Sequence, residues 1–338
     1  MVDIKVLISE ADGFINEGDW HKASETYGKA LNLMMAHGPA KVDEKEHARV
    51  LRRKAHAESR MGELMEAREH LDAAICISER VKDKTGLADA YRGLGHVFIL
   101  LEVEDTAFSY YDKALKLALE CNAKELVGRI HIELGNLSFH RYDFEQAKAE
   151  YMKAINLLER TGNKNELARA YGNLGEAFKK TRDLEMSITQ HRVSIALSDE
   201  IGDETMKAWA IANVAECYAD LGDLAQARTY IWAAFDIMEK NKDRRGLVIA
   251  YGIGSMISLK ENDIVGAKYL LNMSLEICDD INSPLQKAEV LRNYARVYLA
   301  EGKTEEAVGN LKKALEIFEG AKRDKDADIT RRLMRSAD

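Results

Sequence analysis

Hydrophobic and polar residues alternate along this chain in a pattern that repeats every 40 residues. Each period holds two apolar stretches of helical length, each followed by a short polar break, which predicts a helix, a turn, a second helix and a second turn. Eight copies are present; the last seven follow without a gap, and four extra residues precede the second. The copies begin near Asp3, Glu46, Gly86, Glu125, Asn165, Glu204, Gly246 and Gln286. Such a repeat predicts an array of stacked helical pairs rather than separate globular domains.

Three places in every copy hold only glycine, alanine or serine. The first is Ala11, Ala55, Gly95, Gly135, Gly175, Ala215, Ser255 and Ala295. The second, twelve residues later, is Ala23, Ala67, Ala107, Ala147, Ser187, Ala227, Ala267 and Ala307. The third, seven residues further, is Ala30, Ala74, Ala114, Ala154, Ser194, Ala234, Ser274 and Ala314. Because small side chains let two helices approach closely, these places predict where helix A, the first of each copy, touches helix B, the second.

A polar break that contains an aspartate separates helix A from helix B in several copies. Examples are Tyr142-Asp143, Arg182-Asp183, Gly222-Asp223 and Asn262-Asp263. An aspartate placed before a helix accepts a hydrogen bond from a free backbone N–H, and its charge is favoured at that end of the helix dipole. These aspartates therefore predict the starts of the B helices.

The larger side chains beside the small places complete a family signature. The segments that carry it are Tyr91-Arg-Gly-Leu94-Gly95, Tyr171-Gly-Asn-Leu174-Gly175 and Tyr151-Met-Lys-Ala154. They resemble the tetratricopeptide repeat family, and the resemblance extends over roughly residues 3–320. The common unit of that family has about 34 residues. A 40-residue unit without the closing proline resembles the longer variants of kinesin light chains and spindle-orientation adaptors.

The resemblance implies an all-α fold: a right-handed α-solenoid of eight helix-turn-helix repeats with a C-terminal capping helix. We expect residues 1–320 to form the superhelix and residues 321–338 to form the capping helix and a frayed tail. The segment from Asp328 to Met334 is amphipathic enough to cover the last repeat. The resemblance also implies that helix A lines a concave surface, which makes its outward side chains the candidates for contact with a ligand.

Composition and charge narrow the setting of the protein. With 46% hydrophobic and 31% charged residues, the chain is neither disordered nor embedded in a membrane. A net charge of −8 opposes general affinity for nucleic acid or anionic membranes. The four cysteines form no CxxC pair and follow no signal-peptide pattern, so we expect a reduced, cytoplasmic protein. We expect no membrane partner, a nucleic-acid partner is disfavoured, and a homo-oligomer is possible.

Arginines gather at the outward places of helix A in copies 2 to 5. Their guanidinium groups suit bidentate recognition of carboxylate or phosphate, although charged residues also occupy the solvated face of many helices. Asparagines recur at two nearby places, and an amide can both donate to and accept from a peptide backbone. The resemblance implies this role for such asparagines, and the alternative is a helix-surface or capping residue. The predicted contact residues of these two types are Arg49, Arg52, Arg92, Arg129, Arg169, Asn136, Asn173, Asn213 and Asn293.

The same surface turns apolar in copies 6 and 7, where Trp209 and Met256 stand at outward places and Gly252 leaves room beside them. A tryptophan or methionine at helical spacing more often fills the core, so a packing role is the alternative to an anchor pocket. We include both residues in the predicted site. Lasting recognition needs such apolar contacts next to charged ones.

Signals of an enzyme are weak, and we predict none. The chain has no phosphate-binding glycine loop, no HExxH motif and no nucleophile elbow, and His56 and His96 have no third partner at metal-ligand spacing. We therefore expect no catalytic residue, metal or cofactor. The prediction is a non-catalytic scaffold that binds an acidic, partly apolar peptide or helix of another protein in its groove. The alternatives are nucleic-acid or nucleotide binding through the arginines, and self-assembly.

Overall fold

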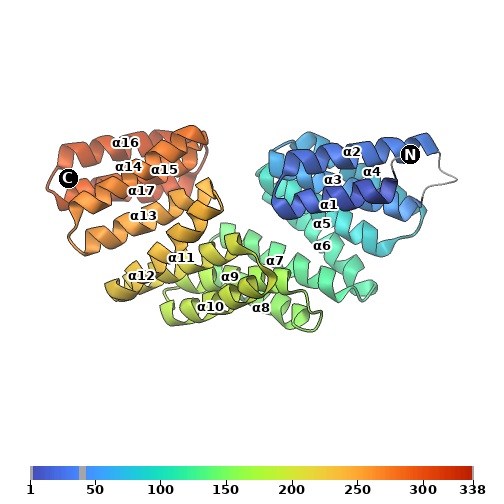
Figure 1. Cartoon of the computed structure of the whole chain (residues 1–338), viewed down its shortest axis with the longest axis horizontal. Helices are drawn as coiled ribbons and strands as arrows, with labels where there is room; N and C mark the ends of the chain where they lie inside the picture. The colour runs from blue at the N-terminus through green and yellow to red at the C-terminus, as the bar shows by residue number, and fades with distance from the viewer. Residues whose placement is uncertain (1–2, 38–42, 337–338) are drawn as a thin grey trace. The chain divides into compact units, whose positions relative to one another are not determined.

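The computed structural model describes residues 3–37 and 43–336, which fold into seventeen α-helices without a strand in these ranges (Figure 1). The helices are α1 (Ile4–Glu17), α2 (Trp20–His37), α3 (Glu44–Met61), α4 (Leu64–Arg80), α5 (Lys84–Leu100), α6 (Glu104–Glu120), α7 (Lys124–His140), α8 (Phe144–Leu158), α9 (Lys164–Lys180), α10 (Leu184–Ile201), α11 (Glu204–Leu221), α12 (Leu224–Lys240), α13 (Arg244–Lys260), α14 (Ile264–Asp280), α15 (Pro284–Ala300), α16 (Thr304–Gly320) and α17 (Asp324–Arg335). The predicted all-α repeat fold is confirmed.

Odd-numbered helices from α1 to α15 are the A helices of the eight copies, and even-numbered helices from α2 to α16 are the B helices. Helices of one copy pack against each other, as α7 does with α8 and α11 with α12. B helices also pack on the A helix of the next copy, as α6 does on α7 and α12 does on α13. No copy encloses a core alone, so neighbouring copies stabilise one another.

The chain divides into two compact units, residues 1–166 and residues 167–338. We call them unit 1 and unit 2. The division falls near the start of α9, so unit 1 holds the first four copies and unit 2 holds almost all of the last four.

The last helix, α17, packs on α16. Its residues Leu333 and Met334 contact the buried cluster of Ala295, Ala307 and Leu311, so α17 covers apolar surface of the final copy. The predicted division into a superhelix of residues 1–320 and a capping segment of residues 321–338 stays a prediction. The end of the predicted frayed tail, residues 337–338, lies outside the described residues.

The predicted starts of the B helices are confirmed. Asp143, Asp183, Asp223 and Asp263 are the N-cap residues of α8, α10, α12 and α14. The side chain of each aspartate accepts a hydrogen bond from the backbone N–H three residues later, at 2.9–3.3 Å. One free donor of each helix is satisfied in this way.

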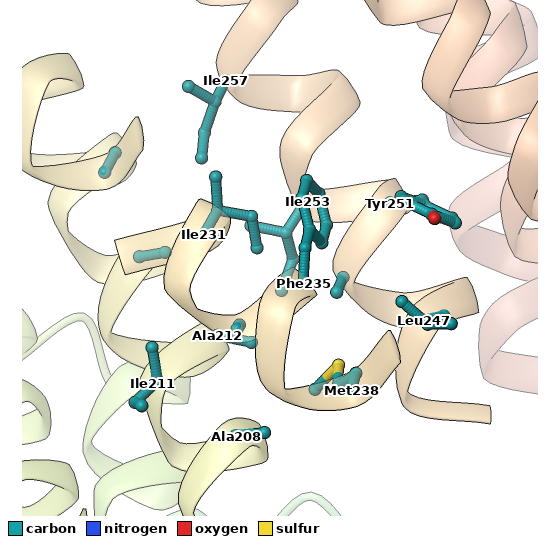
Figure 2. Close-up of a cluster of buried hydrophobic side chains, with 14 of the residues drawn as sticks. Ala208, Ile211, Ala212, Ile231, Phe235, Met238, Leu247, Tyr251, Ile253 and Ile257 are labelled. Carbon is teal, nitrogen blue, oxygen red and sulfur yellow. The ribbon is translucent and has the colours of Figure 1, made fainter. Parts of the chain in front are cut away.

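The small places lie where helices A and B touch, as predicted. A Cβ atom built on Gly135 would lie 2.5 Å from the ring of Tyr151 on α8, and Gly95 stands in the same relation to Tyr111 on α6. In unit 2, apolar side chains pack between the helices, and Figure 2 shows Ile231 and Phe235 of α12 beside Ile253 of α13. These close contacts set the spacing between the A and B helices, and the A helices carry the outward side chains.

Candidate functional site

A pocket of about 660 Å³ opens on the A helices of unit 2. Most of its lining comes from the A helices α9, α11, α13 and α15, and side chains of the B helices α10 and α12 complete it. The pocket belongs to four consecutive copies, so equivalent places in the repeat meet around one cavity. Polar, charged and apolar side chains all contribute to the lining.

One place of helix B holds Tyr27, Leu71, Tyr111 and Tyr151 in unit 1 and no tyrosine in unit 2. The hydroxyl of Tyr151 donates a 2.8 Å hydrogen bond to Oδ1 of Asn136, and Tyr27 makes the equivalent bond to Asp12. In unit 2 the place holds His191, Ile231, Leu271 and Leu311. None of these side chains has a phenol hydroxyl that could bond to the neighbouring A-helix residue, as Tyr151 bonds to Asn136. His191 also lines the pocket.

His191 is buried, with 1% of its surface exposed, and neither ring nitrogen has a hydrogen-bond partner among the described residues. Burial lowers the pKa of His191 to about 4, with nearby Glu176 opposing the shift and Lys179 adding to it. The imidazole is therefore neutral at physiological pH.

A buried lysine sits between two copies at the side of the pocket. The Nζ atom of Lys179 lies 2.9 Å from Oε2 of Glu176 and 2.9 Å from Oδ1 of Asn213, and it also pairs with Glu216. Burial alone would lower the pKa of Lys179, but the two carboxylates outweigh it and raise the pKa. Lys179 thus joins α9 to α11, and its charge is balanced by the protein itself.

The middle of the pocket is apolar. Trp209, Ile249, Ile253 and Met256 line it. Trp209 also packs against the core cluster, and its Nε1 atom donates a 2.8 Å hydrogen bond to Asp243. Trp209 is half-buried, so it both fills the core and presents a face to the pocket.

Arginines of α15 stand at the far side of the pocket. Arg296 donates a 2.7 Å hydrogen bond from Nη1 to Oδ1 of Asn293, and the same atom lies 3.9 Å from the sulfur of Met256. Arg292 lies 3.7 Å from a carboxylate oxygen of Asp326 and 5.2 Å from the ring centre of Phe318. Arg292 is thus held by the helices behind it.

The structure brings six of the eleven predicted contact residues together in this pocket. They are Arg169, Asn173, Trp209, Asn213, Met256 and Asn293. They share one cavity because the same face of each A helix recurs every 40 residues. Sequence reasoning gave no weight to His191 and left Arg296 out of the predicted site. The change from tyrosine to histidine at the shared B-helix place was the signal available for His191.

The other five predicted residues lie in unit 1, where carboxylates and a tyrosine hold them. Arg49 pairs with Glu46 at 2.6 Å. Asn136 bonds to Tyr151 and, at 3.3 Å, to Glu133. The remaining three are arginines around Asp89.

Asp89 gathers Arg52, Arg92 and Arg129 within 4 Å of its carboxylate, at 3.1, 2.9 and 3.9 Å. Arg129 also lies 3.1 Å from Glu166. Burial would raise the pKa of Asp89, but the arginines outweigh it and hold the pKa well below its usual value. The arginine run is therefore largely neutralised within unit 1.

The described residues, 3–37 and 43–336, contain no group of three or more His, Cys, Asp or Glu side chains placed to hold a metal. In the same ranges, no helix is both long and apolar enough to cross a membrane.

These features define a helical-repeat protein with a ligand-sized pocket on its A helices. Residues 46–120 match the family model of the tetratricopeptide repeat, and the recognition of this repeat from the sequence is confirmed. No curated protein sequence matches the chain.

Solved structures share the fold at low sequence identity. A Rap protein complexed with Competence and Sporulation Factor is 12% identical with a TM-score of 0.63, over 99% of this chain and 97% of that one. The apo form of RapI is 13% identical with a TM-score of 0.62, over 83% of this chain and 99% of that one. A STAND ATPase with a tetratricopeptide repeat sensor, from Pyrococcus horikoshii, is 16% identical with a TM-score of 0.67 over 97% of this chain. This chain spans half of the STAND protein's length.

Proposed function

We propose that this protein is a non-catalytic scaffold that binds an acidic, partly apolar peptide or helix of another protein in the pocket of unit 2. The observation that carries the proposal is the composition of that pocket. It combines the three asparagines Asn173, Asn213 and Asn293 with an apolar middle and arginines at its sides. Such a lining offers hydrogen bonds to a peptide backbone, a place for apolar side chains and charge for acidic ones.

Two of these asparagines are oriented by the protein's own cations. The carbonyl oxygen of Asn213 accepts from Lys179, and that of Asn293 accepts from Arg296. The amide nitrogens of both residues have no hydrogen-bond partner among the described residues, and neither is sealed from solvent. They can donate to backbone carbonyls of any peptide sequence.

In this proposal the arginines of unit 1 contribute less to ligand binding than the pocket of unit 2. Arg52, Arg92 and Arg129 already share Asp89, so a ligand would have to compete with that carboxylate. A Rap protein that shares this fold has been solved in complex with Competence and Sporulation Factor, which supports a binding role for the fold. That the protein acts in the cytoplasm stays part of the proposal.

The test converts the pocket of unit 2 to the arrangement of unit 1. Gly175 lies against His191 as Gly135 lies against Tyr151, so His191→Tyr should fold with its ring in the same position. Its hydroxyl would bond to Glu176 and narrow the pocket. The wild-type chain and the variant are exposed to arrays of random dodecapeptides, and the affinity of the captured peptides is measured in solution.

We expect the wild type to capture a family of related peptides. The affinity of His191→Tyr for these peptides should be lower by about tenfold or more, with an unchanged or higher melting temperature. His37→Tyr, an exposed histidine of α2, is the matched control and should bind like the wild type. Equal binding by His191→Tyr would rule out this pocket. Capture of single-stranded RNA in place of any peptide would favour the nucleic-acid alternative.

A further inference from the structure

Five basic side chains line the pocket of unit 2, and four of them are already engaged within the protein. Lys179 pairs with Glu176 and Glu216, and Lys180 lies 3.7 Å from Glu176. Arg292 lies 3.7 Å from Asp326, and Arg169 also has an interaction of its own. Each of these four cations has a partner within the protein, although Nη1 of Arg292 makes only its 3.7 Å ion pair and no hydrogen bond.

Arg296 is the exception. Among residues 3–37 and 43–336, no carboxylate lies within 4 Å of its guanidinium group, and its bond to Asn293 uses only Nη1. The edge formed by Nε and Nη2 makes no hydrogen bond to the described residues, and neither atom is sealed from solvent. Burial and the charge of Arg292 lower the pKa of Arg296, with Glu216 opposing them. A half-buried cation therefore presents an open pair of donors to the pocket.

We infer that Arg296 is the specificity-determining residue of the pocket and that its Nε–Nη2 edge binds a carboxylate of the ligand in a bidentate manner. The inference rests on the proposed function and names the residue that selects acidic ligands. The planar guanidinium matches the two oxygens of a carboxylate, and Met256 beside it offers an apolar surface to the neighbouring side chain.

The free edge of Arg296 offers two donors, which match the two oxygens of one carboxylate. Glu176, Glu216 and Glu289 also line the pocket and offset part of the charge of its five basic side chains. The carboxylate can come from an aspartate or glutamate side chain or from the C-terminus of a chain. Both sources offer the same two oxygens.

Two random dodecapeptide arrays separate these sources. Peptides attached through their C-termini offer only side-chain carboxylates, and peptides attached through their N-termini also offer the terminal one. The full-length wild type, Arg296→Glu and Arg296→Gln are compared on both arrays. Arg245→Glu is the charge-matched control, because Arg245 is an exposed arginine of α13 outside the pocket lining.

We expect wild-type ligands to share a carboxylate at one position, and Arg296→Glu to prefer lysine or arginine there. Affinity for a selected acidic peptide should fall about tenfold to a hundredfold in both Arg296 variants, and about twofold or less in Arg245→Glu. A reversed preference would also show that the variant is folded.

Selection of peptides without a shared carboxylate by the wild type would overturn this inference and leave the proposed function standing. An acidic preference that persists in Arg296→Glu would do the same. Failure of the wild type to capture any peptide would overturn the proposed function itself.

Discussion

Units 1 and 2 are built from the same repeat, but their A helices present different surfaces. In unit 1, Asn136 is bonded by the tyrosine below it, and three arginines converge on Asp89. In unit 2, the equivalent B-helix place holds histidine or aliphatic residues, and a pocket opens among the A helices. The comparison teaches that the same A-helix places can converge on one carboxylate in one unit and line a pocket in the other, depending on the side chains around them.

The largest effect that tests this contrast is expected at Asp89. Asp89→Asn leaves Arg52 and Arg92, which are 13% and 16% exposed, without their anion. We expect the free energy of unfolding to fall by about 3 kcal/mol, as for a broken, largely buried ion pair. Urea unfolding followed by circular dichroism measures it.

The control for Asp89→Asn is Glu176→Gln in unit 2, where Glu216 remains to pair with Lys179. Its cost should be about 1 kcal/mol. Equal losses in the two variants would contradict the view that one carboxylate organises the arginines of unit 1.

The next effect is a dependence of stability on pH that originates in unit 2. The pKa of His191 is about 4 when folded and about 6.5 when unfolded, so the unfolded chain binds the proton more tightly between these values. His191 should therefore withdraw about 2 kcal/mol of stability as the pH falls from 7 to 5.

Unfolding titrations at both pH values, on the wild type and on His191→Phe, isolate this contribution. The variant should lose about 2 kcal/mol less than the wild type over the interval. Carboxylates such as Asp89, whose pKa values are lowered by folding, contribute stability that is lost only at lower pH. Parallel pH profiles of the two proteins would mean that His191 is not held neutral by burial.

A smaller effect is expected from the glycine that supports the tyrosine in unit 1. Gly135→Ala adds a Cβ atom 2.5 Å from the ring of Tyr151, so the two helices must separate. We expect a loss of about 1–2 kcal/mol, measured by the same unfolding experiment.

Gly309→Ala on α16 is the control, because no atom lies within 4 Å of its added Cβ. This change should stabilise the helix slightly. If Gly135→Ala were equally harmless, the close contact between α7 and α8 would not be what fixes Tyr151.

The smallest expected effect is that of the hydroxyl group itself. Tyr151→Phe removes the 2.8 Å hydrogen bond to Asn136 and should cost about 1 kcal/mol. Thermal melts would detect the loss as a lower midpoint. An unchanged midpoint would show that the hydroxyl does not hold Asn136, and the contrast between the units would then rest on ring size alone.

The sequence predicted the parts of this molecule that depend on local periodicity. The small places, the B-helix caps such as Asp143 and the outward position of residues such as Asn213 all follow from the repeat register. The partners of long side chains did not follow, because Arg129 can turn toward Asp89 or toward solvent from the same backbone position. The location of the pocket depends on which long side chain reaches which neighbour, and for this reason the sequence placed Arg52 and Trp209 in one predicted groove.

The tyrosine-or-histidine place of helix B also bears on how such proteins can change over time. Because each copy repeats the same backbone, an exchange of one residue at this place would change the space beside its own A helix and leave the backbones of the other copies intact. A binding site could then migrate along an array by point mutations, without insertion of loops or rearrangement of the fold. His191 packs against Gly175 as Tyr151 packs against Gly135, so a single exchange of tyrosine for histidine accounts for the difference between these two copies at this place.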